Sequence, residues 1–521
     1  MTGPQPTNGR PLQHFSSDNG DGTYRNPVLH ADWSDPDAIR VGADYFMTAS
    51  SFHRVPGLPI LHSRDLVNWT IIGHALTGLE PEAEFAAPQR GGGVWAPALR
   101  HHAGRFWIVY PDPDRGLFVT TAKDPAGPAS TGTRELTWTR PHLLKGGTGL
   151  IDPCPLWDED GSAYLVHGWA KSRAGINNRL TVHRMNFEAT ELLDEGTVVI
   201  DGDDLPGYRT LEGPKFYKRG GWYWIFAPAG GVAHGWQSAF RSRDPFGPYE
   251  ERIVLQQGRT EVNGPHQGAW VTDVDGTDWF VHFQDRGPFG RVVHLQPMRW
   301  GADGWPVIGD RGAPVTGGPK PSGDGPLAAP DTADDFATGI GPQWTWQANP
   351  RSHWRAEGEG LRLHCVPGGT DDLRHLPNLL GQRLPGPSCA ATTTLRLDDP
   401  APGARAGLAV VGDTYAWIGL ERRGNGVHLV HRVADAEGHE RDAAPAVPVD
   451  PNVPVTIGVD VDAEGNCRFL TGAPAQRVGP VFPATAGRWV GAALGLFATG
   501  ESGLAAFTAF EVAESRAGDH E

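Results

Sequence analysis

Short apolar, aromatic-rich runs, each entered from a glycine turn, recur five times in the first three hundred residues of the chain. Loops that carry acidic residues or histidine separate the runs, which follow one another at intervals of roughly 55–60 residues. Runs of this length predict buried β-strands, because aromatic and β-branched residues pack well on a pleated sheet. The runs begin at Gly42, Gly104, Gly161, Gly221 and Gly276.

Five repeats with no helical periodicity between them predict five small sheets around one axis, a five-bladed β-propeller. We expect the propeller to occupy residues 1–310 and a linker rich in proline and glycine to occupy 311–333. Residues 334–521 show shorter strands at closer spacing, as in an antiparallel β-sandwich. These strands are expected at 361–365, 390–397, 406–411, 416–420, 427–430, 455–461 and 506–512.

Composition supports an all-β chain of two domains. The 521 residues exceed one ordinary core, and 70 glycines, 46 prolines and 19 tryptophans fit a turn-dense β-protein better than disorder. The net charge of −16 argues against nucleic acid or an anionic membrane surface as a partner. The first residues lack the apolar core of a signal peptide, and no later stretch is apolar enough to span a bilayer. We therefore expect a cytoplasmic location.

The four cysteines are scattered along the chain and form no Cys-x-x-Cys pair. This spacing favours reduced structural thiols over a zinc site or a disulfide framework. The residues are Cys154, Cys365, Cys389 and Cys467.

Three carboxylates occupy corresponding positions in their repeats. Asp35, Asp152 and Glu212 each precede a glycine-entered strand by roughly ten residues. A proline follows directly after Asp35 and Asp152, and it biases the preceding residue toward an extended or turn conformation. Each residue alone also fits a solvated turn cap. Three in register, bordered by apolar neighbours, favour a shared pocket near the propeller axis.

These motifs together resemble glycoside hydrolase family 43, the inverting β-xylosidases and α-L-arabinofuranosidases. The similarity covers nearly the whole chain, and the C-terminal half resembles the concanavalin-A-like β-sandwich attached to the β-xylosidase branch. The matching segments are Asn26-Pro-Val-Leu, Asp35-Pro-Asp, Ser51-Phe, Pro56-Gly-Leu-Pro-Ile, Trp95-Ala-Pro, Ile151-Asp-Pro, Glu212-Gly-Pro, His266-Gln-Gly and Gly290-Arg-Val.

The resemblance implies a role for each carboxylate: Asp35 is the general base, Glu212 is the general acid, and Asp152 tunes the pKa of the acid and orients it. Inversion needs one carboxylate that activates a water and one carboxylic acid that protonates the leaving oxygen. Because the two must hold opposite protonation states at one pH, a third charge beside the acid is useful.

The resemblance also implies a set of substrate-binding residues. Phe52 and Trp95 are expected as aromatic walls, Arg291 as a fixed cation that binds sugar hydroxyls, and His266 at the bottom of the pocket. Some family members hold calcium near the histidine, so His266 is a candidate calcium ligand although no cofactor is required. Phe497 is the candidate for a phenylalanine of the sandwich that closes the pocket.

Purely structural roles remain open for several of these residues. Arg291 could pair with Asp285 on the surface, a lone histidine is usually a satisfied core residue, and Phe52 could be blade core. His53 and Arg54 stand where the β-xylosidase branch often has an acidic residue and a tryptophan, which puts the xylose preference in doubt.

The expected function is an inverting, exo-acting hydrolase that releases terminal pentose, chiefly as a β-1,4-xylosidase, from oligosaccharides of plant polysaccharides. The alternatives are an α-L-arabinofuranosidase, a bifunctional enzyme, or a non-catalytic carbohydrate-binding propeller. The last alternative leaves the three carboxylates unexplained. The partner is a small oligosaccharide, and a homo-oligomer is compatible with the sequence.

Overall fold

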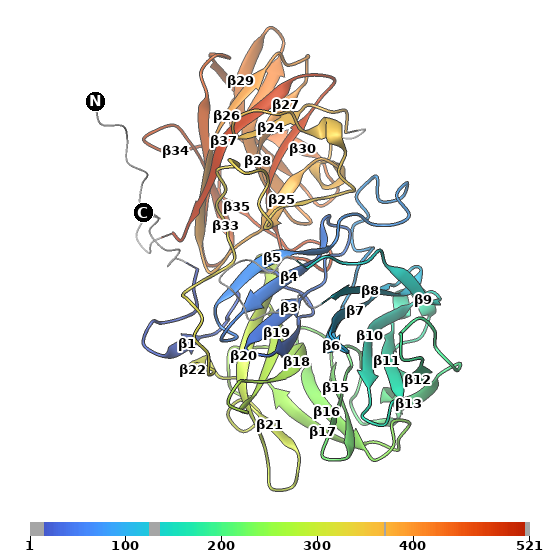
Figure 1. Ribbon diagram of the computed structural model, residues 1–521. Helices are drawn as coiled ribbons and strands as arrows, with labels where there is room; N and C mark the ends of the chain where they lie inside the picture. The colour runs from blue at the N-terminus through green and yellow to red at the C-terminus, as the bar shows by residue number, and fades with distance from the viewer. Residues whose placement is uncertain (1–14, 124–135, 369–370, 516–521) are drawn as a thin grey trace, which may run out of the picture.

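The computed structural model describes residues 15–123, 136–368 and 371–515, and it comprises two β-rich units stacked one on the other (Figure 1). In the described residues, five four-stranded sheets form the lower unit and two larger sheets form the upper one. The predicted fold class, a five-bladed propeller followed by a sandwich, is confirmed. The N-terminal residues that were searched for a signal peptide lie outside the described ranges.

Every blade is a simple antiparallel meander of four consecutive strands. The first two blades contain β2 (Asp37–Val41), β3 (Asp44–Thr48), β4 (Gly57–Ser63), β5 (Trp69–Leu76), β6 (Ala98–His102), β7 (Arg105–Asp112), β8 (Gly116–Lys123) and β9 (His142–Gly146). The third contains β10 (Leu150–Trp157), β11 (Ala163–Trp169), β12 (Arg179–Met185) and β13 (Thr197–Asp201). The last two contain β14 (Lys215–Arg219), β15 (Trp222–Ala229), β16 (Trp236–Ser242), β17 (Glu250–Gln256), β18 (His266–Thr272), β19 (Asp278–Asp285), β20 (Arg291–Trp300) and β21 (Pro306–Ile308).

The five glycine-entered runs are the second strands of the five blades, β3, β7, β11, β15 and β19. They are buried along almost their whole length, and β15 exposes part of its first residue only. A strand covered on both faces reads as a continuous apolar run rather than an alternating one, which explains the strength of this signal in the sequence.

The stretch before the first blade closes the ring against the last blade. Leu29 forms an isolated bridge with Val293 of β20, and the backbone N–H of Trp33 donates to the carbonyl of Arg291 at 3.0 Å. The side chain of Asn26 donates to the carbonyl of Leu295 at 2.8 Å. Residues near the start of the propeller therefore lie beside residues near its end.

A short two-stranded sheet joins β1 (Thr23–Arg25) to β22 (Gly317–Pro319), which lies inside the segment predicted as a linker. The domain limits at 310 and 334 stay a prediction. Helical structure in the described ranges consists of α1 (Lys171–Ala174), η1 (Gly202–Asp204), η2 (Gly287–Phe289), η3 (Ser352–Trp354) and η4 (Leu373–His375). None of these described helices is long and apolar enough to cross a membrane.

The sandwich consists of two antiparallel sheets that enclose one apolar core. One sheet contains β23 (Thr345–Trp346), β25 (Leu380–Arg383), β36 (Ala493–Thr499), β27 (Arg405–Val411), β28 (Tyr415–Arg423), β29 (Gly426–Ala434), β30 (Glu440–Asp442) and β31 (Val447–Val449). The other contains β24 (Leu361–His364), β37 (Leu504–Ala513), β26 (Cys389–Asp398), β32 (Val455–Val461), β33 (Asn466–Thr471), β34 (Gln476–Arg477) and β35 (Phe482–Pro483). All seven expected strands are present.

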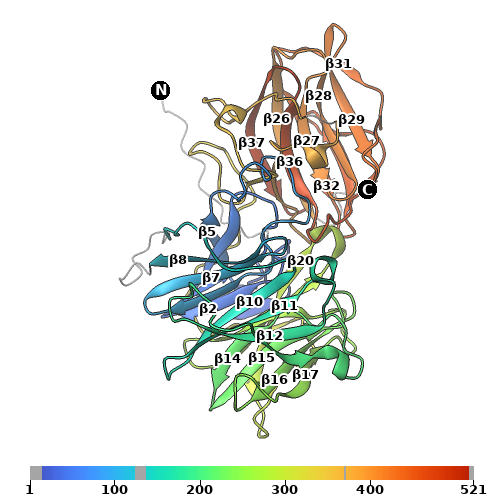
Figure 2. The same ribbon diagram turned by 90° about the vertical axis from the view of Figure 1, so that its right-hand side faces the viewer.

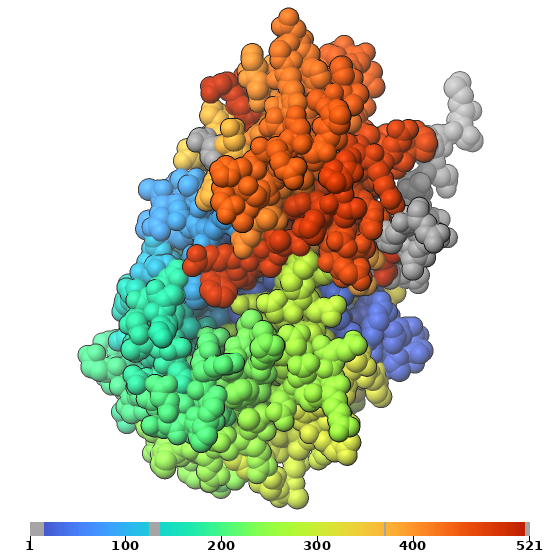
Figure 3. Space-filling model, turned by 180° about the vertical axis from the view of Figure 1, so that it is seen from behind, coloured from blue at the N-terminus to red at the C-terminus, as the bar shows by residue number. Residues whose placement is uncertain are grey.

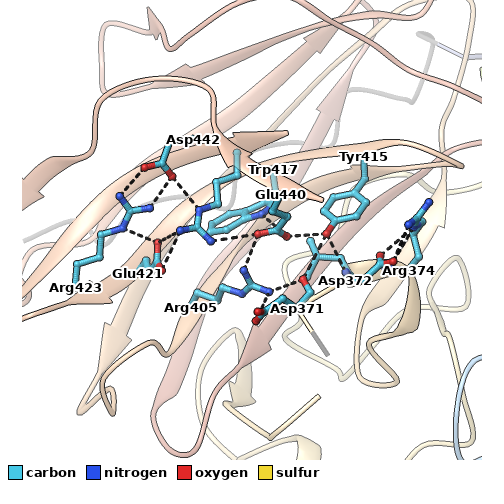
Figure 4. A network of polar contacts seen from close by, with 12 residues as sticks. Asp371, Asp372, Arg374, Arg405, Tyr415, Trp417, Glu421, Arg423, Glu440 and Asp442 are labelled. Atoms are coloured by element: carbon cyan, nitrogen blue, oxygen red, sulfur yellow. Dashed lines mark hydrogen bonds and ion pairs between the residues drawn. The ribbon is translucent and has the colours of Figure 1, made fainter. Parts of the chain in front are cut away.

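A dense network of charged side chains covers part of the first sheet (Figure 4). Its centre is Glu440, which accepts from Arg405 at 2.7 Å, Tyr415 at 2.7 Å, Trp417 at 3.2 Å and Arg432 at 3.2 Å. The network joins side chains of β27, β28, β29 and β30, and the loss of one partner would leave the buried Glu440 charge less compensated.

The sandwich rests directly on the propeller, as the side and back views make clear (Figures 2 and 3). Val55 and Trp346 exchange two backbone hydrogen bonds of 3.0 and 2.6 Å, as in a sheet. Phe289 and Val292 of the propeller are part of the apolar core of the sandwich. The two units are thus joined by backbone hydrogen bonds and by buried apolar surface, and they do not behave as independent domains on a flexible linker.

We expect Arg383→Met to destabilise the junction. The Nε of Arg383 donates to the carbonyl of Asp32 at 2.6 Å, and its guanidinium lies 3.8 Å from the ring centroid of Trp33. Losing a charge-assisted hydrogen bond and a cation–π contact should cost about 1–3 kcal/mol. The measurement is the free energy of unfolding in urea. Exposed Arg351, changed to Met, is the control, and equal stability of the two variants would contradict the prediction.

Candidate active site

The first strand of each blade lies at the propeller axis. In the described structure, β2 contacts β6 and β18, and β10 contacts β6 and β14. Asp35 lies just before β2, Asp152 lies within β10, and Glu212 lies just before β14. The repeat position recognised in the sequence therefore brings three carboxylates from three blades to one end of the axis.

Several residues other than glycine at this end of the axis have a positive φ, a left-handed backbone conformation that is unfavourable for any residue with a Cβ atom. The φ angles are 56° at Asp35, 52° at Phe52, 55° at Asp152, 53° at Thr210 and 38° at Gln267. Such conformations cost about 1–3 kcal/mol each and gather at functional sites, where the surrounding fold imposes them. In Asp152 the strain coincides with a register shift between β10 and β11.

Asp35 is almost fully buried and accepts a hydrogen bond on each oxygen. Ser50 Oγ donates to Oδ2 at 2.5 Å, and Arg291 Nη1 donates to Oδ1 at 2.9 Å. The backbone N–H of Arg291 is in turn bound by Asp32 Oδ1 at 3.0 Å. Arg291 thus forms its ion pair with Asp35 and not with Asp285, and it supplies the positive charge that a buried carboxylate needs.

Asp152 and Glu212 are neighbours across the third and fourth blades. The N–H of Gly213 donates to Asp152 Oδ2 at 2.7 Å, so the residue after Glu212 is tied directly to the Asp152 carboxylate. Burial, together with the negative charges of Glu212 and Asp35, raises the pKa of the Asp152 carboxyl to about 8. The Asp152 carboxyl therefore retains its proton at neutral pH.

His266 contacts the carboxylate of Glu212 from the buried side of the site. Its Nε2 lies 3.1 Å from Glu212 Oε1, and the ring is 1 % exposed and packs against Phe283. The carboxylate is partly accessible, with 26 % of its side-chain surface exposed. Glu212 is therefore the member of the Asp152–Glu212 pair that a ligand can reach.

The predicted calcium ligand does not have a calcium donor set around it. Calcium takes six to eight oxygen ligands, whereas His266 offers a nitrogen whose nearest polar neighbour is Glu212. No group of three or more His, Cys, Asp or Glu in the described part of the chain could hold a metal ion. The side chains that the structure describes do not fit this ion.

A group of buried charged side chains lies next to the three carboxylates, on the first strands of the blades. Asp37 Oδ2 accepts from Arg100 at 2.8 Å and lies 3.5 Å from the Lys215 ammonium, which also donates to the carbonyl of Pro97. A second guanidinium nitrogen of Arg100 lies 2.7 Å from the sulfur of Cys154. Asp37 and Lys215 are at most 1 % exposed, so both charges are withdrawn from water.

Aromatic rings line the side of the site. Trp95 is half-buried, and its ring centroid lies 6.4 Å from Phe52 and 6.2 Å from Trp489 of the sandwich. A hollow of about 380 Å³ opens beside them, lined in part by Arg291, Asp285 and Trp489. Trp95 is accessible beside Trp489, whereas Phe52 is 2 % exposed, and their roles as aromatic walls stay a prediction.

The structure does not bring Phe497 to this site. Its side chain is fully buried in β36, edge-to-face with Trp417 in the core of the sandwich. The sandwich instead presents Trp489, which is 45 % exposed, has a φ of 66°, and accepts a hydrogen bond from Ser34 Oγ at 3.4 Å. The sequence analysis missed Trp489 and Ser50, since neither lies in a periodic run; a lone tryptophan in a glycine-rich loop was the only local signal.

His53 and Arg54 depart from the family pattern and lie next to Phe52. His53 is 5 % exposed, and burial lowers the pKa of its imidazole to about 3. It is therefore a neutral, buried ring.

Comparison with known proteins supports one family. The model of "Glycosyl hydrolases family 43" matches residues 24–306, and that of "Beta xylosidase C-terminal Concanavalin A-like domain" matches residues 333–513. The chain belongs to glycosyl hydrolase family 43. It is therefore a glycoside hydrolase.

Curated relatives and solved structures of this family match most of the chain. A protein of Formosa agariphila named "Beta-xylosidase" is 32 % identical over 92 % of this chain and 88 % of its own. A Bacteroides ovatus protein named "Non-reducing end alpha-L-arabinofuranosidase BoGH43B" is 30 % identical over 79 % of this chain and 78 % of its own. The solved structure titled "Bacteroides ovatus Xyloglucan PUL GH43B" aligns with a TM-score of 0.81 at 25 % identity, covering 95 % of this chain and all of that one.

We expect Asp152→Asn to stabilise the fold in a pH-dependent way. Since the pKa of Asp152 is raised to about 8 in the folded state, the stability linked to its proton is complete below the unfolded pKa and is lost as pH rises through the folded one. The gain from a neutral amide should therefore grow between about pH 4 and pH 8 and then level off, reaching a few kcal/mol because one pKa unit is about 1.4 kcal/mol. Urea unfolding at several pH values measures it. A gain independent of pH would contradict the prediction, and exposed Asp275→Asn is the control.

Proposed function

We propose that the protein is an inverting, exo-acting hydrolase that removes single pentose units from the non-reducing ends of plant-polysaccharide oligosaccharides, with β-1,4-xylosidase as the main activity. The observation that carries the proposal is the contrast between two carboxylate environments. Asp35 is paired with a guanidinium, whereas burial and the neighbouring carboxylates raise the pKa of Asp152 to about 8. An acid and a base that coexist at one pH are what inversion requires.

In the proposed mechanism Asp35 removes a proton from a water that attacks the anomeric carbon directly. Glu212, the accessible carboxyl, donates a proton to the leaving oxygen, and Asp152 tunes the pKa of this acid and orients it through its bond to the N–H of Gly213. His266 holds Glu212 in place, and Arg291 orients Asp35 and binds sugar hydroxyls. The separation of roughly 6.5–9.5 Å typical of inverting pairs leaves room for the water. The reaction needs no cofactor.

The shape of the site supports end-on binding. Side chains of Asp37, Arg100 and Lys215, from three different blades, meet close to the carboxylates, which favours a closed pocket over a channel through the propeller. The loop of Trp489 bounds one side. A closed pocket with one wall supplied by a second domain admits the end of a chain, which is the basis for the exo assignment.

The choice between pentoses draws on the relatives. Names with β-xylosidase and α-L-arabinofuranosidase both occur among proteins at least 30 % identical to this chain, so arabinofuranosidase activity is the second candidate. Rates on p-nitrophenyl β-D-xyloside, α-L-arabinofuranoside and a set of aryl hexosides distinguish the two. Turnover of hexosides but of neither pentoside would reject the proposal.

Asp35→Ala should keep the fold and sugar binding but lose turnover by about 10²–10⁴-fold or more, because no other group is placed to activate the water. Glu212→Ala should slow a disaccharide far more than an aryl glycoside, whose phenol leaves without protonation. NMR of early product should detect the inverted anomer. A retained anomer, or azide rescue of Asp35→Ala that yields a retained glycosyl azide, would identify Asp35 as a nucleophile instead. Asp275→Ala is the control.

Trp489→Ala should raise KM for xylobiose by about 3- to 10-fold, as expected when an aromatic contact worth about 0.5–1.5 kcal/mol is lost. Phe497→Leu should leave KM unchanged and lower the melting temperature, because it changes only packing in the sandwich core. Steady-state kinetics and thermal unfolding of both variants test the assignment. An increase in KM for Phe497→Leu alone would restore Phe497 as the residue that closes the pocket.

A further inference from the structure

A cavity of about 740 Å³ lies on the flank of the propeller between the first two blades. Its walls come from the end of β5, the segment 77–85, strands β7 and β8, the segment 136–141, and Asn349 and Pro350 of the sandwich. None of the three carboxylates lines it. Its wall nevertheless adjoins the active site, because Val94 in the wall exchanges backbone hydrogen bonds of 2.7 and 3.0 Å with Phe52.

The wall of this cavity is held by both domains. The side chain of Asn349 accepts from the N–H of Leu79 and donates to its carbonyl, both at 2.8 Å. The N–H of Asn349 donates to the carbonyl of Phe85 at 2.7 Å. A loop fixed at two points by the sandwich keeps its shape without a ligand, as most small-molecule sites do.

Aromatic side chains form much of the lining. Tyr110 and Phe118 stack with their ring centroids 5.6 Å apart and an interplanar angle of 18°, and half-buried Trp138 lies on the neighbouring strand segment, bridged to Ala122. The half-buried ring of Trp138 suits the apolar face of a sugar ring, and the cavity volume of about 740 Å³ lies within the range of small-molecule sites.

Three neutral polar groups of the lining are free to bind a ligand. The hydroxyl of Tyr110 and the indole N–H of Trp138 have no hydrogen-bond partner in the described structure, and neither does Nε2 of His74. Burial lowers the pKa of His74 to about 3, so the ring is uncharged.

Two of the three carboxylates in the lining are ion-paired, and the third, exposed Glu82, has no ion pair in the described structure. Glu80 pairs with Arg140 at 2.6 Å, and Asp112 pairs with Arg115 at 2.5 Å. A cation would have only exposed Glu82 to pair with, whereas a neutral polyhydroxylated ligand can use the free donors and acceptors and the aromatic rings of the lining. The lining therefore favours an uncharged sugar chain over an ion.

We propose that this cavity is a second carbohydrate-binding site, which holds internal units of a neutral pentose polymer near the active site. The ligand class depends on the proposed function, since it assumes the same polysaccharide whose ends are hydrolysed. An exo-acting pocket binds chain ends, which are scarce in a polymer. A flank site for internal units keeps the enzyme on the chain between cleavages by raising the effective concentration of ends.

The test separates binding to polymer from hydrolysis of a small substrate. Trp138→Ala removes an aromatic face, Tyr110→Phe removes one oxygen, and Phe187→Ala, at an exposed ring on the third blade, is the matched control. Each change is made in the full chain, alone for kinetics on aryl β-xyloside and together with Asp35→Ala for binding. Native affinity electrophoresis in soluble neutral arabinoxylan, with β-glucan as a second polymer, gives the apparent dissociation constant.

We expect arabinoxylan to retard the parent and Trp138→Ala to weaken retention by about 10-fold, equivalent to about 1.4 kcal/mol. Tyr110→Phe should weaken it less, the control should match the parent, and kcat/KM on the aryl xyloside should stay unchanged in all three. Absence of retention in the parent, retention that survives both Trp138→Ala and Tyr110→Phe, or an equal loss in Phe187→Ala would overturn the proposal. A steep fall of retention with salt would also overturn it, as the mark of an ionic ligand. Failure of the proposed function has a separate signature: no turnover of any aryl pentoside, whatever the polymer binding.

Discussion

Charge buried at the propeller axis is the constraint on which the rest of the structure depends. The first strands pack closely enough to exclude water, yet they carry Asp37, Arg100 and Lys215 into that space. An unpaired charge there would cost several kcal/mol, so the blades must meet in the one arrangement that pairs all three. Asp37 follows Asp35 by two residues and Lys215 follows Glu212 by three, so the same arrangement places the reactive carboxylates.

The strands that could be predicted from the sequence are those buried on both faces, because such strands are apolar along their whole length. The glycine-entered runs are the second strands because continuous aromatic and β-branched segments have few other stable environments. The positions of Asp35, Asp152 and Glu212 followed from repeat register. Ser50 and Trp489 could not be found this way, since each is brought to the site only by tertiary contacts. The error at Phe497 has a local cause: its segment is apolar at every position, which is the pattern of a buried strand such as β36 and not of a pocket rim.

The sandwich acts on the active site through a short segment of the propeller. Arg383 binds the carbonyl of Asp32, and the carbonyl of Trp489 binds the hydroxyl of Ser34. Both hydrogen bonds fix residues immediately before Asp35. The backbone of Asp35 has an unfavourable positive φ, which persists only when the surrounding structure imposes it. The second domain thus contributes an aromatic wall and also stabilises the conformation of a carboxylate that it does not touch.

The closure of the ring has a consequence for biosynthesis. Asp35 and Arg291 are separated by 256 residues, and the tryptophan that lines their pocket comes almost two hundred residues later. A nascent chain exposes Asp35 early but has no counter-ion for it until the fifth blade emerges from the ribosome. Contacts of such long range form late in folding, so partly synthesised or truncated chains lack a working site. A chain is therefore expected to be hydrolytically active only after synthesis and folding of both domains are complete.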